Sequence, residues 1–207
     1  GCTADSQCDD GAKGCSTKVC SNKKCLFTPT TGNGCCLPTV WSNSFDENLL
    51  EGMVLANAAG PTKGWQIWGS APMNKSPKGI LYYGQPLAQN FDFGASKGTA
   101  TTPLLALAPD VASTLVMWLY MDTEGGGAGS YDDLYLYPVV DGVQMTAVWN
   151  KSTAGFTTGQ WIALSADVTV YKGKTLELLF NFNTKDSIGN GGLGVLIDDL
   201  TVERSCP

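Results

Sequence analysis

Short runs of apolar and β-branched residues, separated by glycine, proline and polar residues, fill most of the chain. The most apolar run is the last one, residues 191–203, in which the adjacent carboxylates Asp198 and Asp199 stand between apolar neighbours. Charge placed beside buried apolar side chains is costly unless something compensates it. The run therefore predicts a buried final strand whose acid pair either holds a cation or is simply solvated at the strand end.

Earlier runs have the length and composition of strands: residues 64–68, 80–83, 101–107 and 114–120. Several of them are apolar enough to be buried on both faces. Glycine is abundant and only 15% of the residues are charged, while no long helical pattern is present. These features predict an all-β protein with many turns.

Two runs carry more specific signals. Residues 134–140 and 143–149 flank Asp141-Gly142, which predicts a β-hairpin, and Pro138 is expected at an edge or a bulge. Residues 175–183 alternate strictly, with Glu177 and Asn181 on the polar side, whereas residues 161–171 alternate imperfectly. The strict alternation predicts a strand with one face in the core and one face in water.

The first 36 residues differ from the rest because they hold most of the cysteines and few apolar side chains. The eight cysteines are Cys2, Cys8, Cys15, Cys20, Cys25, Cys35, Cys36 and Cys206. Their even number predicts disulfides and an oxidising compartment, and a zinc site is disfavoured because no C-x2-C pair occurs. Seven cysteines cannot pair among themselves, so Cys206 is expected to bridge to one of the N-terminal cysteines, with Cys35 and Cys36 as the favoured partners. We therefore expect a disulfide-rich segment at 1–36 and one β-domain at 37–207.

Charge and composition exclude several functions. The net charge of −6 disfavours a nucleic-acid partner, and the absence of histidine removes Ser-His and Cys-His catalysis and histidine-ligated zinc. The sequence contains no apolar stretch of about 18 residues, so no membrane span is predicted. No signal peptide is recognisable, so we expect the chain to be a mature or excised piece. A neutral sugar or a cation is a more suitable binding partner for an acidic chain of this composition.

Residues 8–29 resemble a short cysteine-rich repeat of large bacterial surface proteins. The resemblance rests on Cys8-Asp9-Asp10-Gly11, on Cys15-Ser16-Thr17-Lys18-Val19-Cys20, and on Cys25 followed by Thr28-Pro29. In that family the repeat is a spacer or stalk module. The resemblance implies a cell-surface setting and brings no catalytic residues.

Residues 40 to 203 resemble the bacterial cleaved-adhesin jelly roll (choice-of-anchor J) and its MAM-like relatives. The resemblance rests on the order of short motifs: Phe45-Asp46, Gly64-Trp65, residues 102–105, residues 115–120, Trp161, residues 178–182 and residues 194–202. It implies an extracellular, non-catalytic two-sheet jelly roll with a structural calcium. On this chain the implied calcium ligands are Asp46 or Glu47 from the start of the domain and Asp198 or Asp199 from its last strand.

The function favoured by these observations is adhesion or carbohydrate binding, because exposed aromatic rings on a jelly roll can stack on sugars. The candidate rings are Trp68, Tyr82, Tyr83 and Tyr131, each of which can instead be a core or strand-edge residue. One alternative is a structural spacer of a larger surface protein. Another is a polysaccharide-active enzyme, for which the paired acids are Glu47/Glu51, Asp122/Glu124 and Asp132/Asp133. Without a recognisable active-site motif, we expect no catalysis.

Overall fold

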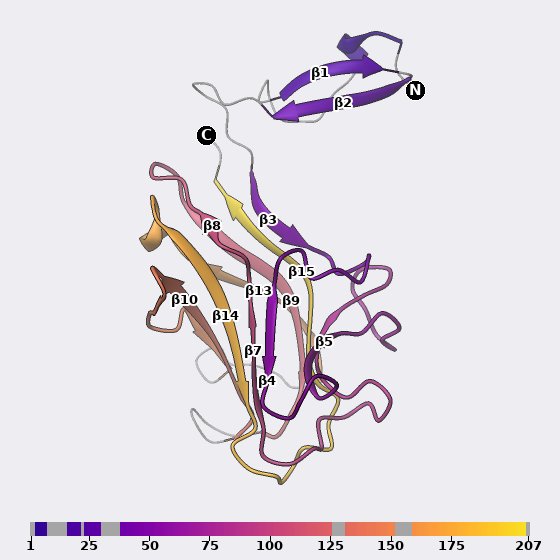
Figure 1. Ribbon diagram of the computed structural model, residues 1–207, viewed down its shortest axis with the longest axis vertical. Helices are drawn as coiled ribbons and strands as arrows, with labels where there is room; N and C mark the ends of the chain where they lie inside the picture. Colours follow the sequence, from indigo (N-terminus) through magenta and orange to yellow (C-terminus); the bar gives the residue numbers. More distant parts are fainter. Residues whose placement is uncertain are drawn as a thin grey trace.

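The protein is a two-layered antiparallel β-sandwich with a β-hairpin near its N-terminus (Figure 1). The computed structural model describes residues 3–7, 16–21, 23–29, 38–125, 131–151 and 159–205. The hairpin consists of β1 (Ser16–Ser21) and β2 (Lys24–Pro29), preceded by the 3₁₀ turn η1 (Asp5–Gln7). The all-β jelly-roll sandwich that the sequence predicts is thus confirmed.

One layer of the sandwich is a seven-stranded sheet. Its main path runs through β11 (Val143–Gln144), β10 (Asp133–Val140), β14 (Thr175–Asn183), β7 (Lys97–Thr101) and β4 (Val54–Asn57). Two short strands lie beside this path: β12 (Trp149–Asn150) pairs with β10, and β8 (Leu105–Ala106) pairs with β14.

The other layer is a six-stranded sheet. Its path runs through β13 (Trp161–Asp167), β9 (Ser113–Asp122), β15 (Gly194–Arg204), β6 (Leu81–Gly84) and β5 (Gly64–Ile67), and β3 (Thr39–Asn43) also pairs with β15. The 3₁₀ turn η2 (Thr169–Tyr171) follows β13. The first strand of the sandwich, β3, therefore lies beside its last strand, β15.

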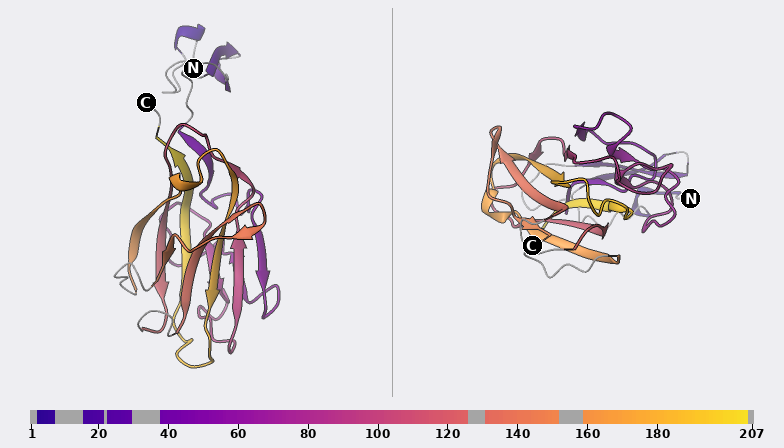
Figure 2. Two further views of the ribbon diagram at one scale, coloured as in Figure 1. Left: turned by 90° about the vertical axis from the view of Figure 1, so that its left-hand side faces the viewer. Right: turned by 90° about the horizontal axis from the view of Figure 1, so that it is seen from below.

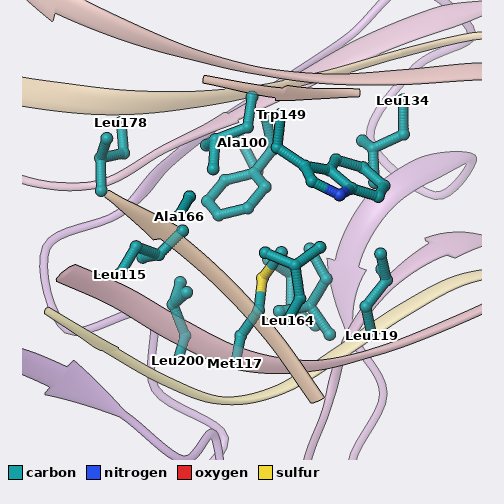
Figure 3. Packing of buried hydrophobic residues seen from close by; sticks show 14 of the residues in the cluster. Ala100, Leu115, Met117, Leu119, Leu134, Trp149, Leu164, Ala166, Leu178 and Leu200 are labelled. Atoms are coloured by element: carbon teal, nitrogen blue, oxygen red, sulfur yellow. The ribbon is translucent and has the colours of Figure 1, made fainter. Parts of the chain in front are cut away.

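The core lies between the two sheets, which Figure 2 shows from the side and from below. Figure 3 shows Leu134, Trp149 and Leu178 of the seven-stranded sheet facing Leu115, Leu164 and Leu200 of the six-stranded sheet. The alternation predicted for residues 175–183 holds, because Leu176, Leu178, Phe180 and Phe182 are fully buried and Glu177 and Asn181 are not. Each sheet therefore has one dry face and one outer face.

Three predicted strands are shorter than expected. Residues 101–107 do not form one strand, because β7 ends at Thr101, the pairing with β14 stops at Pro103, and it resumes only at β8. Residues 161–171 divide into β13 and η2. The Asp141-Gly142 hairpin forms, with positive φ at both turn residues, but its second strand is divided into β11 and β12, both of which pair with β10.

In the N-terminal hairpin, Cys20 lies opposite Cys25 in the strand register, and both are disulfide-bonded. The remaining cysteines (Cys2, Cys8, Cys15, Cys35, Cys36 and Cys206) lie outside the described residues. Oxidation of all eight and the domain boundary after residue 36 therefore stay predictions. None of the helical turns in the described ranges is long and apolar enough to cross a membrane.

Candidate functional site

Asp198 is fully buried in β15, and hydrogen bonds compensate its charge. Its Oδ2 accepts hydrogen bonds from the backbone N–H groups of Lys75 and Ser76 at 2.8 and 2.9 Å. Its Oδ1 accepts from the Ser76 hydroxyl at 2.7 Å and from the Asp199 N–H at 2.9 Å. Carboxylates that accept several N–H bonds are strongly stabilised in the charged form. Asp198 thus ties the loop that contains residues 75 and 76 to the centre of the six-stranded sheet.

Asp199 is placed differently because the strand bulges beside it. Its φ is +48°, and the register between β15 and β9 shifts between Asp198 and Thr201. The bulge turns Asp199 toward a pocket of about 340 Å³ that is also lined by Asp46, Glu47 and Glu51. Burial raises the pKa of Asp199, and the charges of Asp198 and Asp46 raise it further. Three of the four residues that the family resemblance implies as calcium ligands therefore share this acidic pocket.

The fit of this acidic pocket to calcium is partial. Asp46 Oδ1 already accepts a hydrogen bond from Lys78 N at 2.9 Å, and both oxygens of Asp198 are occupied. Within the described ranges, no three Asp, Glu, His or Cys side chains cluster in a way that could hold a metal ion. Carboxylate oxygens are donors that a hard cation accepts, but Asp46, Glu47 and Asp199 do not lie close enough together here to form a metal cluster, and Asp198 is a tether for the loop.

The structure buries three of the four aromatic rings that the sequence suggested for sugar stacking. Tyr82 and Tyr83 are fully buried, and Trp68 is 6% exposed. Tyr83 belongs to the main core, whereas Trp68 and Tyr82 belong to a second apolar cluster. Their rings cannot stack on a sugar in this structure, so this expectation is corrected. Only Tyr131, at 43% exposure, keeps an accessible ring.

The outer face of the seven-stranded sheet carries an aromatic pair that sequence reasoning missed. The rings of Tyr135 and Tyr137 on β10 stack at a centroid distance of 5.5 Å and an interplanar angle of 13°. Both side chains are half-buried, and they alternate along β10 with the buried Leu134 and Leu136. The alternating pattern of residues 134–140 signals this outer pair. The pattern does not show which face is the outer one, because both faces of the run are rich in large apolar or aromatic side chains.

On the outer side of the sheet, polar side chains of the neighbouring strands lie beside the two tyrosines. Tyr135 lies in register with Asn181 of β14, which lies in register with Thr99 of β7. Tyr137 begins a second row that includes Leu179 and Thr101. Amide and hydroxyl groups donate and accept hydrogen bonds, as sugar hydroxyls require. We name the surface formed by Tyr135, Tyr137, Asn181, Thr99 and Thr101 the tyrosine face.

The six-stranded sheet has a groove of about 480 Å³ on its outer side, lined by residues that include Val116, Trp118, Ser165 and Thr201. The Lys75 ammonium lies 4.0 Å from the centroid of the Trp118 ring. This cation–π contact occupies the ring that would otherwise be the natural stacking surface of the groove. The tyrosine face is therefore the better candidate for sugar stacking.

Comparison with known proteins gives likeness in fold and a distant likeness in sequence. No family model matches the chain. Over 150 residues the chain is 25% identical to bacillopeptidase F of Bacillus subtilis (strain 168), a match that covers 70% of this chain and 10% of that protein. The chain thus spans about a tenth of that relative's length.

Two of the solved structures that share the fold illustrate the likeness. One is TmCBM61 in complex with β-1,4-galactotriose, with a TM-score of 0.53, 13% identity, and coverage of 81% of this chain and 99% of that chain. The other is the K1 cleaved adhesin domain of Lys-gingipain from Porphyromonas gingivalis W83, with a TM-score of 0.52, 16% identity, and coverage of 81% and 98%. The structural neighbours are thus a carbohydrate-binding module and a cleaved adhesin domain, both matched in fold.

Proposed function

We propose that the protein is a non-catalytic, extracellular carbohydrate-binding or adhesion module, and that it contacts glycans through the tyrosine face. The observation that carries the proposal is the stacked pair Tyr135 and Tyr137, flanked by Asn181 on the outer side of a sheet. Aromatic rings provide apolar area for the C–H face of a sugar, while the neighbouring amide can bind its hydroxyls. The fold shared with a galactotriose-bound module supports this function.

Glycan binding should depend on the two tyrosines. A glycan array, followed by titration with β-1,4-galactotriose and xylo-oligosaccharides as probes, should detect binding by the full chain. Tyr135→Ala and Tyr137→Ala should each weaken that binding about fivefold, since an aromatic contact is worth about 1 kcal/mol. The matched control is Trp118→Ala on the other sheet, which should bind as the unchanged chain does.

Two results would contradict this proposal. If Trp118→Ala abolished binding while both tyrosine variants retained it, the groove of the six-stranded sheet would be the glycan site. If no glycan bound, the alternative of a spacer module in a larger surface protein would be favoured.

The calcium implied by the family resemblance is retained as a proposal for the acidic pocket. Its side-chain donors would be Asp46, Glu47 and Asp199, which line one pocket beside the paired first and last strands but would have to draw closer together than they lie in this structure. Burial raises the pKa of Asp199, and a divalent cation would relieve the repulsion from Asp198 and Asp46 that adds to this shift. Calcium should therefore raise the melting temperature of the chain, and Asp199→Asn and Asp46→Asn should each reduce that increase.

A further inference from the structure

A second group of buried polar side chains lies at the end of the sandwich opposite β3 and the chain termini. Figure 1 shows the loop between β14 and β15 at this end. Glu124 follows β9, Asp132 precedes β10, and Asn190 belongs to the loop between β14 and β15. The N–H of Glu124 donates to Asp132 Oδ2 at 2.7 Å, and a Cβ on Gly189 would lie 2.9 Å from Glu124 Oε2. The three segments are therefore packed together.

Three side-chain oxygens of this group are buried and accept no hydrogen bond from the part of the chain that the structure describes: Glu124 Oε2, Asp132 Oδ1 and Asn190 Oδ1. Asp132 is fully buried and Asn190 is 2% exposed. Burial raises the pKa of Asp132 to about 6, and the charges of Glu124 and Asp186 add to this shift, against the Glu124 N–H bond and the charge of Lys151. Buried acceptors of this kind are normally paired, so the group calls for a compensating positive charge.

The nearest internal cation does not satisfy these oxygens. The Lys151 ammonium is buried and donates to Thr123 Oγ1 at 3.0 Å and to the backbone carbonyls of Glu124, Tyr131 and Asp132. It therefore holds the backbone of the loop and leaves Asp132 Oδ1 and Glu124 Oε2 without a hydrogen bond. Burial lowers the pKa of Lys151 in spite of the neighbouring carboxylates.

The other charged groups at this end already have partners. Lys185 pairs with Asp133 at 2.6 Å. Asp122 Oδ2 accepts a hydrogen bond from Leu193 N, and Asp186 Oδ1 accepts one from Ile188 N. Five carboxylates (Asp122, Glu124, Asp132, Asp133 and Asp186) thus face two ammonium groups (Lys151 and Lys185). The excess of negative charge is concentrated on Glu124 and Asp132, whose free oxygens are buried.

We propose that Glu124, Asp132 and Asn190 form a site for a hard divalent cation of the calcium type, separate from the acidic pocket on β15. Two carboxylates and one amide oxygen are donors that calcium accepts, together with backbone carbonyls and water. The cation links the end of β9, the start of β10 and the β14–β15 loop. This site does not depend on the glycan-binding proposal or on the calcium proposed for the acidic pocket.

The test is calcium titration of the chelator-stripped full chain by calorimetry, with terbium luminescence as a second readout. The unchanged chain should bind calcium, and Asp132→Asn and Glu124→Gln should each weaken this site at least thirtyfold. Asp132→Asn should also raise the melting temperature of the calcium-free chain, because it replaces a buried, partly unpaired carboxylate by a neutral amide. Asn tolerates the positive φ of 49° at this position.

Asp122→Asn is the matched control, because it removes a carboxylate at the same end that already accepts a hydrogen bond. It should leave the affinity of this site within about threefold, and Asp199→Asn should leave it unchanged. The inference is overturned if the unchanged chain binds no calcium, or if all its calcium binding is lost in Asp199→Asn and retained in Asp132→Asn and Glu124→Gln. Loss of glycan binding in the tyrosine variants would not affect this result.

Discussion

Asp198 shows how one buried charge can be compensated by the chain itself. The sequence predicts a need for compensation at Asp198 and Asp199, because both stand in an apolar strand. It could not predict that the loop containing Lys75 and Ser76, more than a hundred residues earlier, provides donors for Asp198. It also could not predict the bulge that separates the two side chains, since a bulge depends on the register with β9.

The first prediction concerns the hydrogen bonds of Asp198. In the presence of a chelator, Asp198→Asn should lower the free energy of unfolding by about 1–3 kcal/mol. A carboxylate accepts hydrogen bonds at both oxygens, whereas an amide has one acceptor oxygen and would point its NH₂ group at the remaining donors. Urea unfolding monitored by tryptophan fluorescence measures this change. Asp199→Asn is the control and should change stability by less than about 0.5 kcal/mol. Equal losses in the two variants would mean that Asp198 is not the tether.

A second prediction concerns alkaline pH. Burial raises the pKa of Tyr83 to about 12, the hydrogen bond with Ser96 opposes the shift, and the charge of Asp132 adds to it. The stability that this proton contributes is complete below pH 10 and is lost as pH rises toward 12, at a total of about 2–3 kcal/mol. Urea unfolding at pH 9 and pH 11 should show the loss. The loss of stability should be smaller in Tyr83→Phe. If the unchanged protein and Tyr83→Phe showed the same pH dependence, the assignment of the loss to Tyr83 would be wrong.

Tyr82 and Tyr83 also explain why sequence reasoning chose the wrong rings. Alternation assigns successive residues to opposite faces of a strand, but it does not reveal that loops cover the outer face at Tyr82. Tyr82 packs there with Trp68, Tyr120 and Leu196 in the second apolar cluster. The tyrosine face differs because the described chain places no such apolar cluster over Tyr135.

At the scale of strands, strict alternation predicted the strand ends most reliably, and the places where a strand is interrupted were the hardest to predict. Residues 175–183 match β14 at both ends, because alternation, length and turn signals agree. Residues 101–107 appeared to be one strand, but Pro103 has no N–H to donate. Pairing with β14 continues for one more residue through Thr102, whose N–H donates to Leu178 O at 3.0 Å.

Thr102 supplies the third prediction. Its hydroxyl, 1% exposed as a residue, accepts a hydrogen bond from Leu178 N at 2.9 Å and donates to Pro103 O at 3.1 Å. Thr102→Val keeps the shape but leaves the buried N–H of Leu178 without an acceptor, so stability should fall by about 1–3 kcal/mol. Thermal and urea unfolding measure the fall. Thr102→Ser, which keeps the hydroxyl, should lose less, and an equal loss would assign the effect to packing instead.

At the scale of the whole molecule, one end of the sandwich gathers the beginning and the end of the domain. Arg204 N donates to Pro38 O, and β3 pairs with β15 from Thr39 to Asn43. The other end gathers the loops that carry Glu124, Asp132 and Asn190. The family resemblance implied the first arrangement, because its implied calcium ligands come from the start of the domain and from the last strand. It did not anticipate the second, because those residues come from three separate loops.

The last prediction is that Cys206 forms a disulfide with Cys35 or Cys36. All three residues lie outside the described ranges, but residues 38 and 204 are hydrogen-bonded, and each of the two candidate links from there is only a few residues long. Since a residue spans at most about 3.6 Å, the Cα distance of about 5.5 Å that a disulfide needs is within reach.

Such a bridge would close a loop of more than about 100 residues, so Cys206→Ser should cost about 4–5 kcal/mol in the chain-entropy model. Non-reducing peptide mass spectrometry should identify the bridge, and a free thiol at Cys206 would contradict it. Cys20→Ser is the matched control, because Cys20 lies in the N-terminal hairpin and the sandwich core contains no described residue of that hairpin. It should leave the melting temperature of the sandwich nearly unchanged.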